Sequence, residues 1–157
     1  MPGILIVCTA NLCRSPMAEA LLKRLAAGRP DASDWHIESA GVMADYGLSP
    51  TPTAQFVMET MGMDISTHRS QPTVVGMVES FDLILVMEGW QKKKLRKQFP
   101  DIAERIYLLS EMAGSPQDIA DPVGGDMVDY RLTAHELEHY LTEGFERIYQ
   151  LASHGKG

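Results

Sequence analysis

Short apolar runs alternate with longer amphipathic segments along this chain, and this alternation restricts the folds that it can adopt. The first run, Gly3–Val7, has no polar side chain, which is typical of a strand buried on both faces. Ser15–Ala27 follows with apolar residues near helical spacing. The pattern predicts further strands at 35–39, 82–87 and 105–109, and further helices at 52–61, 88–98 and 127–152.

Strands that alternate with helices predict an α/β sandwich with a central parallel sheet. The length of 157 residues fits a single domain over residues 1–157. In such sheets, ligands bind beyond the carboxyl ends of the strands, where the strand order reverses. Residues 8–15 come directly after the first strand, so we expect a ligand site there.

Charge and composition exclude several classes of protein. The formal net charge of -7 argues against a nucleic-acid partner, and the basic run Lys92–Lys97 is typical of a solvated helix face. No apolar run approaches the ~20 residues that span a bilayer. The N-terminus lacks the basic segment of a signal peptide, and two cysteines are too few for a disulfide scaffold. We therefore expect a cytoplasmic protein without a membrane partner.

The loop between the first strand and the first helix carries the reactive groups. A protonated thiol is a weak nucleophile, but two features favour a Cys8 thiolate. The N-terminal N–H groups of the following helix point towards the loop, and Arg14 adds a fixed positive charge. The same groups, with successive backbone N–H groups turned inward, suit a phosphate dianion. A guanidinium also grips two phosphate oxygens at once.

Other residues of this loop have supporting roles in the hypothesis. Ser15 can donate its hydroxyl to the Cys8 sulfur when that sulfur is a leaving group, and Asn11 is suited to organising the loop. The competing interpretation is a buried structural Cys8, a helix-capping Ser15 and a surface Arg14. The preceding strand and the following helix favour the reactive site.

Several segments, taken in order, resemble the low-molecular-weight protein tyrosine phosphatase family. The similarity covers nearly the whole chain and lies at 7–19, 39–41, 68–70, 82–87 and 121–122. It implies a three-layer sandwich with a central four-stranded parallel sheet and the phosphate loop after the first strand. It also implies a cysteinyl-phosphate intermediate formed without a metal or other cofactor.

The resemblance assigns the remaining site residues. Asp121 matches the general acid of the family, and the resemblance disfavours the neighbouring Asp118 and Asp126 for this role. Pro122 restricts Asp121 to an extended backbone, which helps to aim its side chain. The substrate phosphate is expected to lie in the loop formed by Thr9, Ala10, Asn11, Leu12 and Cys13. For Cys13 two interpretations remain equal: a second thiol that forms a reversible disulfide with oxidised Cys8, or a small buried hydrophobe.

Departures from the family bear on the substrate. Ala10 stands where the family has glycine, which predicts slight strain if that position needs a positive φ. Val123 and the two glycines after it resemble the protein arginine phosphatase branch. Leu12 instead resembles the isoleucine of the tyrosine phosphatases, and Tyr46 lies in a segment that often supplies an aromatic wall.

The balance favours phosphotyrosine in phosphorylated proteins as the substrate, with phosphoarginine as the alternative. Inorganic phosphate is then expected as product and inhibitor.

Two further interpretations come from other classes of enzyme. His135 and His139 enclose the zinc-protease pattern His-Glu-x-x-His, with Glu136 as the base, but a charged helix near the chain end is more typical of a solvated face. Arsenate reduction coupled to thioredoxin needs cysteines beyond Cys13, and the chain has none. We therefore expect no metal ligand in this chain.

Overall fold

The computed structural model describes residues 2–154 and contains one parallel sheet. Its strands are β1 (Gly3–Cys8), β2 (His36–Gly41), β3 (Leu83–Val86) and β4 (Ile106–Leu108). They follow the order β2-β1-β3-β4, and every pair is parallel. The predicted four-stranded parallel sheet is therefore confirmed, and β1 occupies a central position in it.

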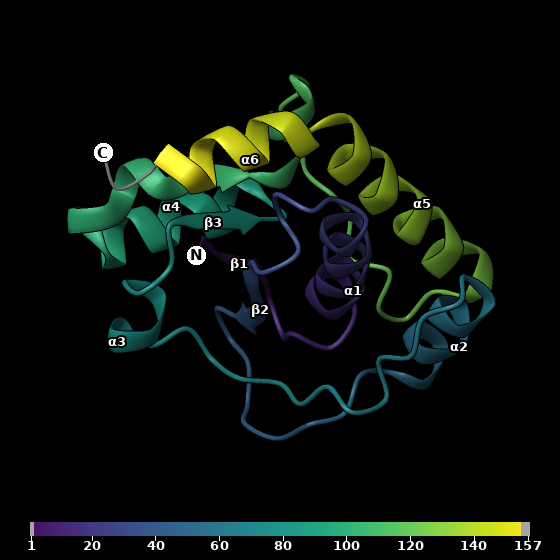
Figure 1. The fold of residues 1–157 in the computed structure, drawn as a ribbon. Coiled ribbons are helices and arrows are strands. Elements are labelled where there is room, and N and C mark those ends of the chain that lie inside the picture. The colour runs from purple at the N-terminus through teal and green to yellow at the C-terminus, as the bar shows by residue number, and fades with distance from the viewer. Residues whose placement is uncertain (1, 155–157) are drawn as a thin grey trace.

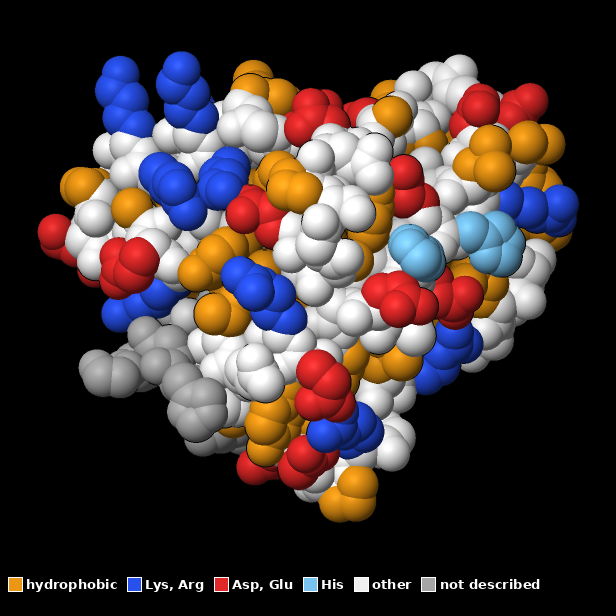
Figure 2. All heavy atoms as spheres, turned by 90° about the horizontal axis from the view of Figure 1, so that it is seen from above, with side chains coloured by type: hydrophobic (Ala, Val, Ile, Leu, Met, Phe, Trp, Pro, Cys, Tyr) orange, Lys and Arg blue, Asp and Glu red, His pale blue; other side chains and the backbone are white. Residues whose placement is uncertain are grey.

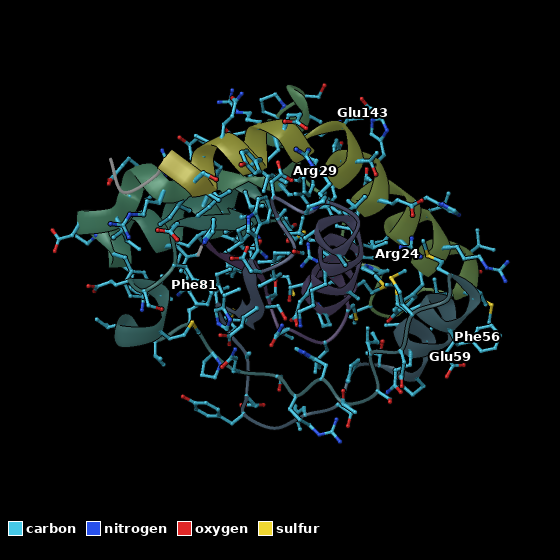
Figure 3. All side chains as sticks on the ribbon, viewed as in Figure 1. Arg24, Arg29, Phe56, Glu59, Phe81 and Glu143 are labelled. Atoms are coloured by element: carbon cyan, nitrogen blue, oxygen red, sulfur yellow. The ribbon has the colours of Figure 1, made fainter. Side chains whose placement is uncertain are left out.

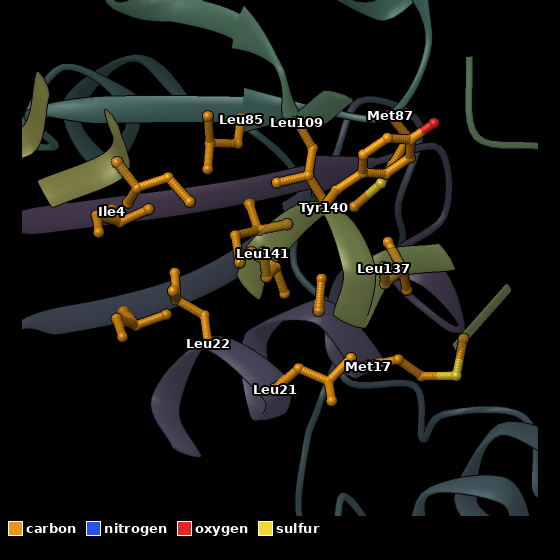
Figure 4. Close-up of a cluster of buried hydrophobic side chains, with 14 of the residues drawn as sticks. Ile4, Met17, Leu21, Leu22, Leu85, Met87, Leu109, Leu137, Tyr140 and Leu141 are labelled. Carbon is orange, nitrogen blue, oxygen red and sulfur yellow. The ribbon is translucent and has the colours of Figure 1, made fainter. Parts of the chain in front are cut away.

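Side chains of β1 alternate between two hydrophobic clusters because successive residues of a strand face opposite sides. Ile4, Ile6 and Cys8 belong to the larger cluster, whereas Leu5 and Val7 belong to the smaller one. Figure 4 shows the larger cluster, where side chains of the sheet meet those of two helices. All six residues of β1 are buried, which explains why the run has no polar alternation.

Helices cover both faces of this sheet (Figure 1). On one side, α1 (Arg14–Ala27) and α5 (Met127–Glu143) pack into the larger cluster, with α2 (Pro52–Thr60) against α5. On the other side, α4 (Gly89–Gln98) contributes Leu95 to the smaller cluster. The remaining elements are α3 (Val75–Val78), α6 (Phe145–His154) and the 3₁₀ segments η1 (Pro100–Arg105) and η2 (Leu109–Ala113). The three-layer sandwich is confirmed.

The prediction of one continuous helix over 127–152 is wrong. The chain forms α5 and α6 instead, separated at Gly144. A Cβ at residue 144 would lie 2.5 Å from the Cβ of Met112, so the backbone passes η2 too closely for any side chain. The close approach of η2 therefore requires glycine at residue 144, and glycine is a residue type at which helices commonly end.

Polar contacts join α1 to the helices beside it. Arg24 donates to Glu138 of α5 at 3.0 Å, and Figure 3 shows Arg24 between these two helices. Just after α1, the Arg29 guanidinium lies over the Phe145 ring of α6, 5.0 Å from its centroid. Arg24 and Glu138 are both well exposed, so this ion pair contributes little to stability compared with the buried cluster.

Within residues 2–154, none of the helices is both long and apolar enough to cross a membrane.

Candidate active site

The phosphate loop, residues 8–15, lies at the carboxyl end of β1. This is the switch point of the sheet, because β2 pairs with one side of β1 and β3 with the other. The loop ends where α1 begins at Arg14, with Cys13 at the N-cap position and no side-chain cap. The N–H groups of the first turn are therefore open to a ligand in the loop.

Asn11 organises the phosphate loop from its centre. It is fully buried, and its φ of 61° is the one positive value among non-glycine residues from 2 to 154. Its side-chain amide donates to the Ser15 hydroxyl at 2.7 Å and to Ser39 at 3.0 Å, and its side-chain oxygen accepts from the Gln71 N–H at 3.0 Å. The strain expected at Ala10 is wrong: the left-handed residue is Asn11, a residue type that tolerates this conformation.

The Cys8 sulfur faces donors inside the loop. The backbone N–H of Asn11 donates to Cys8 Sγ at 3.3 Å, and Ser15 Oγ lies 3.0 Å from the same sulfur. An amide N–H can only donate, so the sulfur is the acceptor in that contact. The Asn11 amide donates to Ser15 Oγ, so the serine proton is directed either to the sulfur at 3.0 Å or to the Ala40 carbonyl at 3.4 Å, and the sulfur is the nearer acceptor. This arrangement stabilises negative charge on Cys8.

Hydrogen bonds on both terminal nitrogens hold the Arg14 side chain in place. The side chain is 1% exposed, and one terminal nitrogen donates to Glu88 at 2.9 Å and to the carbonyl of Ile119 at 2.7 Å. The other terminal nitrogen donates to Thr9 Oγ1 at 3.2 Å and to Asp121 at 3.4 Å. Contacts from three separate segments therefore set the position of the guanidinium before any ligand binds.

Asp121 reaches the phosphate loop from the segment that precedes α5. One carboxylate oxygen contacts Arg14, and the other accepts from the Val123 N–H at 3.0 Å, which fixes the side chain. The rival aspartates have other partners. Asp118 accepts from the Gly89 N–H at 2.8 Å, and Asp126 accepts from the Asp129 N–H to cap α5. Asp121 is thus the one of these three that contacts the loop arginine.

Sequence reasoning missed two residues that support the loop. Glu88 forms the ion pair with Arg14, and Gln91 is fully buried and donates to Thr9 Oγ1 at 3.0 Å. Both follow the carboxyl end of β3, which neighbours β1 in the sheet. The sequence does show an acidic residue, Glu88, directly after a buried strand. Its contact with Arg14 could be predicted only by knowing that β1 and β3 are adjacent in the sheet.

Cys13 is enclosed on the core side of the loop. Its sulfur lies 3.6 Å from Thr51 Oγ1 and 3.6 Å from the Tyr130 hydroxyl. Burial raises the pKa of the Cys13 thiol above its ordinary value, despite the two hydroxyl groups that oppose the shift. Both cysteines are free thiols. The disulfide with oxidised Cys8 stays a prediction.

The residues expected to surround the substrate differ in exposure. Leu12 is half-buried against the larger cluster, whereas Tyr46 and Val123 are 71% and 58% exposed. Within residues 2–154 no hydrogen bond or ring contact links the Tyr46 side chain to the phosphate loop. Behind the loop, His68 Nε2 lies 3.1 Å from the Asn11 carbonyl, so His68 braces it.

The two histidines of the zinc-protease pattern are exposed on α5. His135 and His139 line a hollow together with Glu136 and Glu143. Burial raises the pKa of Glu136. No group of three His, Cys, Asp or Glu side chains between residues 2 and 154 is arranged to hold a metal ion. The pattern therefore lacks a set of ligands.

Gly41, at the end of β2, allows a close approach between β2 and the phosphate loop. A Cβ at this position would lie 2.5 Å from the Thr9 carbonyl oxygen and 2.9 Å from the Asn11 nitrogen, both backbone atoms. We expect Gly41→Ala to displace the loop at a cost of about 1–3 kcal/mol, and to lower kcat/KM for an aryl phosphate about 10- to 100-fold. Gly76→Ala is the control, because nothing lies within 4 Å of that Cβ. Equal rates for the two variants would contradict this role.

Comparison with known proteins agrees with this geometry. Residues 3–152 match the family described as low molecular weight phosphotyrosine protein phosphatase. A probable low molecular weight protein-tyrosine-phosphatase, EpsP of Ralstonia nicotianae, is 43% identical over 119 residues, which cover 76% of this chain and 77% of the relative. The protein-arginine-phosphatase of Bacillus subtilis is 36% identical over 141 residues, covering 89% of this chain and 92% of the relative.

A solved structure repeats the fold. It is a YwlE arginine phosphatase in which the active-site cysteine is replaced by a serine that carries phosphate. The TM-score is 0.84 at 33% identity, over 94% of this chain and 95% of that one. The match of the family model over residues 3–152 and this similarity of fold agree with each other. The chain belongs to the low molecular weight phosphotyrosine protein phosphatase family.

Proposed function

We propose that this chain hydrolyses phosphotyrosine in proteins through a phosphocysteine at Cys8. The thiolate attacks phosphorus while the bond to the tyrosine oxygen breaks, and Asp121 gives its proton to that oxygen. Arg14 and the loop N–H groups hold the three equatorial oxygens of the transferring group. In the second step Asp121 takes a proton from the attacking water, and the Ser15 hydroxyl stabilises the departing thiolate.

The observation that carries this proposal is the position of Cys8 Sγ, which accepts from the Asn11 N–H and lies 3.0 Å from Ser15 Oγ, in the loop that also holds Arg14. A structural cysteine needs neither contact. The phosphorylated serine in the related arginine phosphatase supports the same position as the point of phosphoryl transfer. The contact of Arg14 with Asp121 at 3.4 Å places a carboxyl group beside the guanidinium that would hold the phosphate.

An apolar rim supports an aromatic substrate. Met43, Tyr46 and Leu48 are exposed on the segment after β2, whose backbone is tied to the loop by the Met43 N–H donating to the Thr9 carbonyl. Val123 is exposed beside Asp121. Exposed apolar side chains on segments that contact the loop or Asp121 favour a phosphate ester on a ring, because the ring loses contact with water when it binds.

The second candidate substrate is phosphoarginine. One of the related proteins is named for that activity, and the two glycines after Val123 are the feature of this sequence that resembles that branch. Leu12 is the counter-observation. Its half-buried apolar side chain packs against the larger cluster and offers no hydrogen bond to a guanidinium.

Leu12→Thr separates the two substrates. We expect the wild type to prefer a phosphotyrosine peptide over a matched phosphoarginine peptide. The variant is expected to lose about tenfold in kcat/KM on phosphotyrosine, since it removes about 1–2 kcal/mol of apolar contact. Initial rates on both peptides measure this, and Leu12→Ile is the matched control. A wild type that prefers phosphoarginine would contradict the phosphotyrosine assignment.

The proposal extends to the cellular location, the partners and the product of the enzyme. Catalysis needs a reduced Cys8, so we place the protein in the reducing cytoplasm, which the two free cysteines support. Its partners are phosphorylated proteins. Inorganic phosphate leaves as the product and competes for the same loop, and the mechanism uses no metal or other cofactor.

A further inference from the structure

A basic stripe runs along the outer face of α4. It consists of four exposed residues, which share one face because they are three or four positions apart: Trp90, Lys93, Lys94 and Lys97. Leu95, on the opposite face of α4, is fully buried. The stripe and Gln98 line a hollow of about 590 Å³. In Figure 2, Lys and Arg side chains gather on the side of the molecule where Figure 1 places α4.

The lysines of the basic stripe have no hydrogen-bond or ion-pair partner in the part of the chain that the structure describes. Neighbouring cations of α4 are engaged: Lys92 pairs with Glu111, and Arg96 donates to the Ile106 carbonyl at 2.8 Å. No hydrogen bond or ion pair within residues 2–154 involves the three lysines of the stripe. Like charges this close on a helix repel one another, so the stripe lowers helix stability without any internal compensation.

The aromatic ring of Trp90 lies on the same face of α4 as the three lysines. It is 44% exposed, and no ring or cation–π contact within residues 2–154 involves it. The other tryptophan of the chain, Trp35, is buried and stacks on Phe145 at 5.3 Å. An exposed tryptophan next to unpaired cations has the composition of a binding surface, since aromatic residues are enriched where proteins meet partners.

We propose that the basic stripe binds an acidic segment of the phosphorylated protein substrate. This inference rests on the proposed function, because α4 begins directly after Glu88, the residue that holds Arg14 in the active site. An α-helix of ten residues is about 15 Å long. About five extended residues cover that distance, so a peptide with its phosphotyrosine in the loop can reach the stripe.

The composition of the basic stripe favours an acidic peptide segment over a membrane or a nucleic acid as the partner. A membrane-bound helix needs a broad apolar face, and Trp90 is the single large apolar side chain of the stripe. A nucleic acid would be repelled by a chain whose net charge is -7. A short acidic segment meets the local positive charge and avoids most of the negative surface.

The test compares two double variants that each remove two unpaired positive charges. Lys93→Gln/Lys94→Gln alters the stripe. Arg131→Gln/Arg147→Gln is the control, because both arginines are exposed, have no partner within residues 2–154 and lie outside the hollow. The substrates are a phosphotyrosine peptide with glutamates about five residues from the phosphate, the same peptide with glutamines, and a small aryl phosphate.

We expect the stripe variant to lose about 5- to 10-fold in kcat/KM on the glutamate peptide at about 50 mM salt, through KM, and the loss to vanish at high salt. Rates on the glutamine peptide and the aryl phosphate stay at the wild-type level, as does every rate of the control variant. Binding of the unphosphorylated glutamate peptide changes tryptophan fluorescence in the wild type but not in Trp90→Phe.

Three outcomes overturn the docking surface: equal losses in both double variants, no preference for the glutamate peptide, or tighter binding of the stripe to anionic phosphatidylserine vesicles or RNA than to the peptide. Failure of the proposed function gives a different result. In that case no substrate turns over in any variant, and the fluorescence titration still decides whether the stripe binds the acidic peptide.

Discussion

Cys8→Ser is expected to lower kcat on aryl phosphates by more than about 10³-fold, because the serine hydroxyl is not ionised at neutral pH and has no base beside it. Phosphate affinity is expected to persist. Arg14 keeps its bonds to Glu88 and Ile119, and the backbone of the loop does not depend on the sulfur. Steady-state kinetics measures the first effect, and calorimetry with inorganic phosphate measures the second.

The matched control for this substitution is Cys13→Ser. Both thiols are buried in the same loop, but the Cys13 sulfur contacts Thr51 and Tyr130, away from the donors at Cys8. We expect the control to keep kcat within about threefold of the wild type. Quenched reactions of the wild type are expected to show one phosphate on Cys8 by mass spectrometry. Turnover by Cys8→Ser within tenfold of the wild type would exclude Cys8 as the nucleophile.

Asp121→Ala is expected to slow phenyl phosphate hydrolysis by about 10²- to 10³-fold, since phenoxide is a poor leaving group that needs a proton as it departs. The loss on p-nitrophenyl phosphate is expected to be several times smaller, because that leaving group depends less on protonation. The ratio of kcat/KM for the two substrates is therefore the measurement, and it isolates proton donation from any general damage to the site.

Asp126→Asn serves as the control for Asp121→Ala. Asp126 caps α5, and asparagine caps a helix equally well, so both rates are expected to stay near the wild type. If Asp121→Ala lost the same factor on both substrates, Asp121 would be a positioning residue for Arg14 and not the acid.

Much of the fold could be predicted from local patterns. The buried character of Gly3–Val7 and the spacing of Ser15–Ala27 were sufficient to place β1, the phosphate loop and α1, because a strand, a tight turn and a helix start depend on neighbouring residues. The four strands appear within two residues of their predicted bounds. The break at Gly144 was missed although glycine disfavours a helix interior, and the close approach of Met112, 32 positions away, is visible only in the fold.

The residues of the phosphate loop could be predicted from the sequence, whereas the partners that hold them could not. Cys8, Arg14 and Ser15 were predicted as site residues from the sequence alone, and the structure brings the Cys8 sulfur and the Ser15 hydroxyl within 3.0 Å of each other. The partners that hold Arg14, namely Glu88 and the Ile119 carbonyl, come from segments after β3 and before α5. These two groups come close to Arg14 because of the order of the strands in the sheet, which local periodicity does not determine.

The sequence by itself was sufficient to place the phosphate loop between β1 and α1, since a strand, a turn and a helix start depend on the order of neighbouring residues. Tertiary structure alone decided which charges are used. Lys92 and Lys93 are adjacent in one basic run, yet Lys92 pairs with Glu111 while Lys93 faces solvent. Successive residues of a helix point in directions about 100° apart, so only packing against the rest of the chain separates a bound charge from a free one.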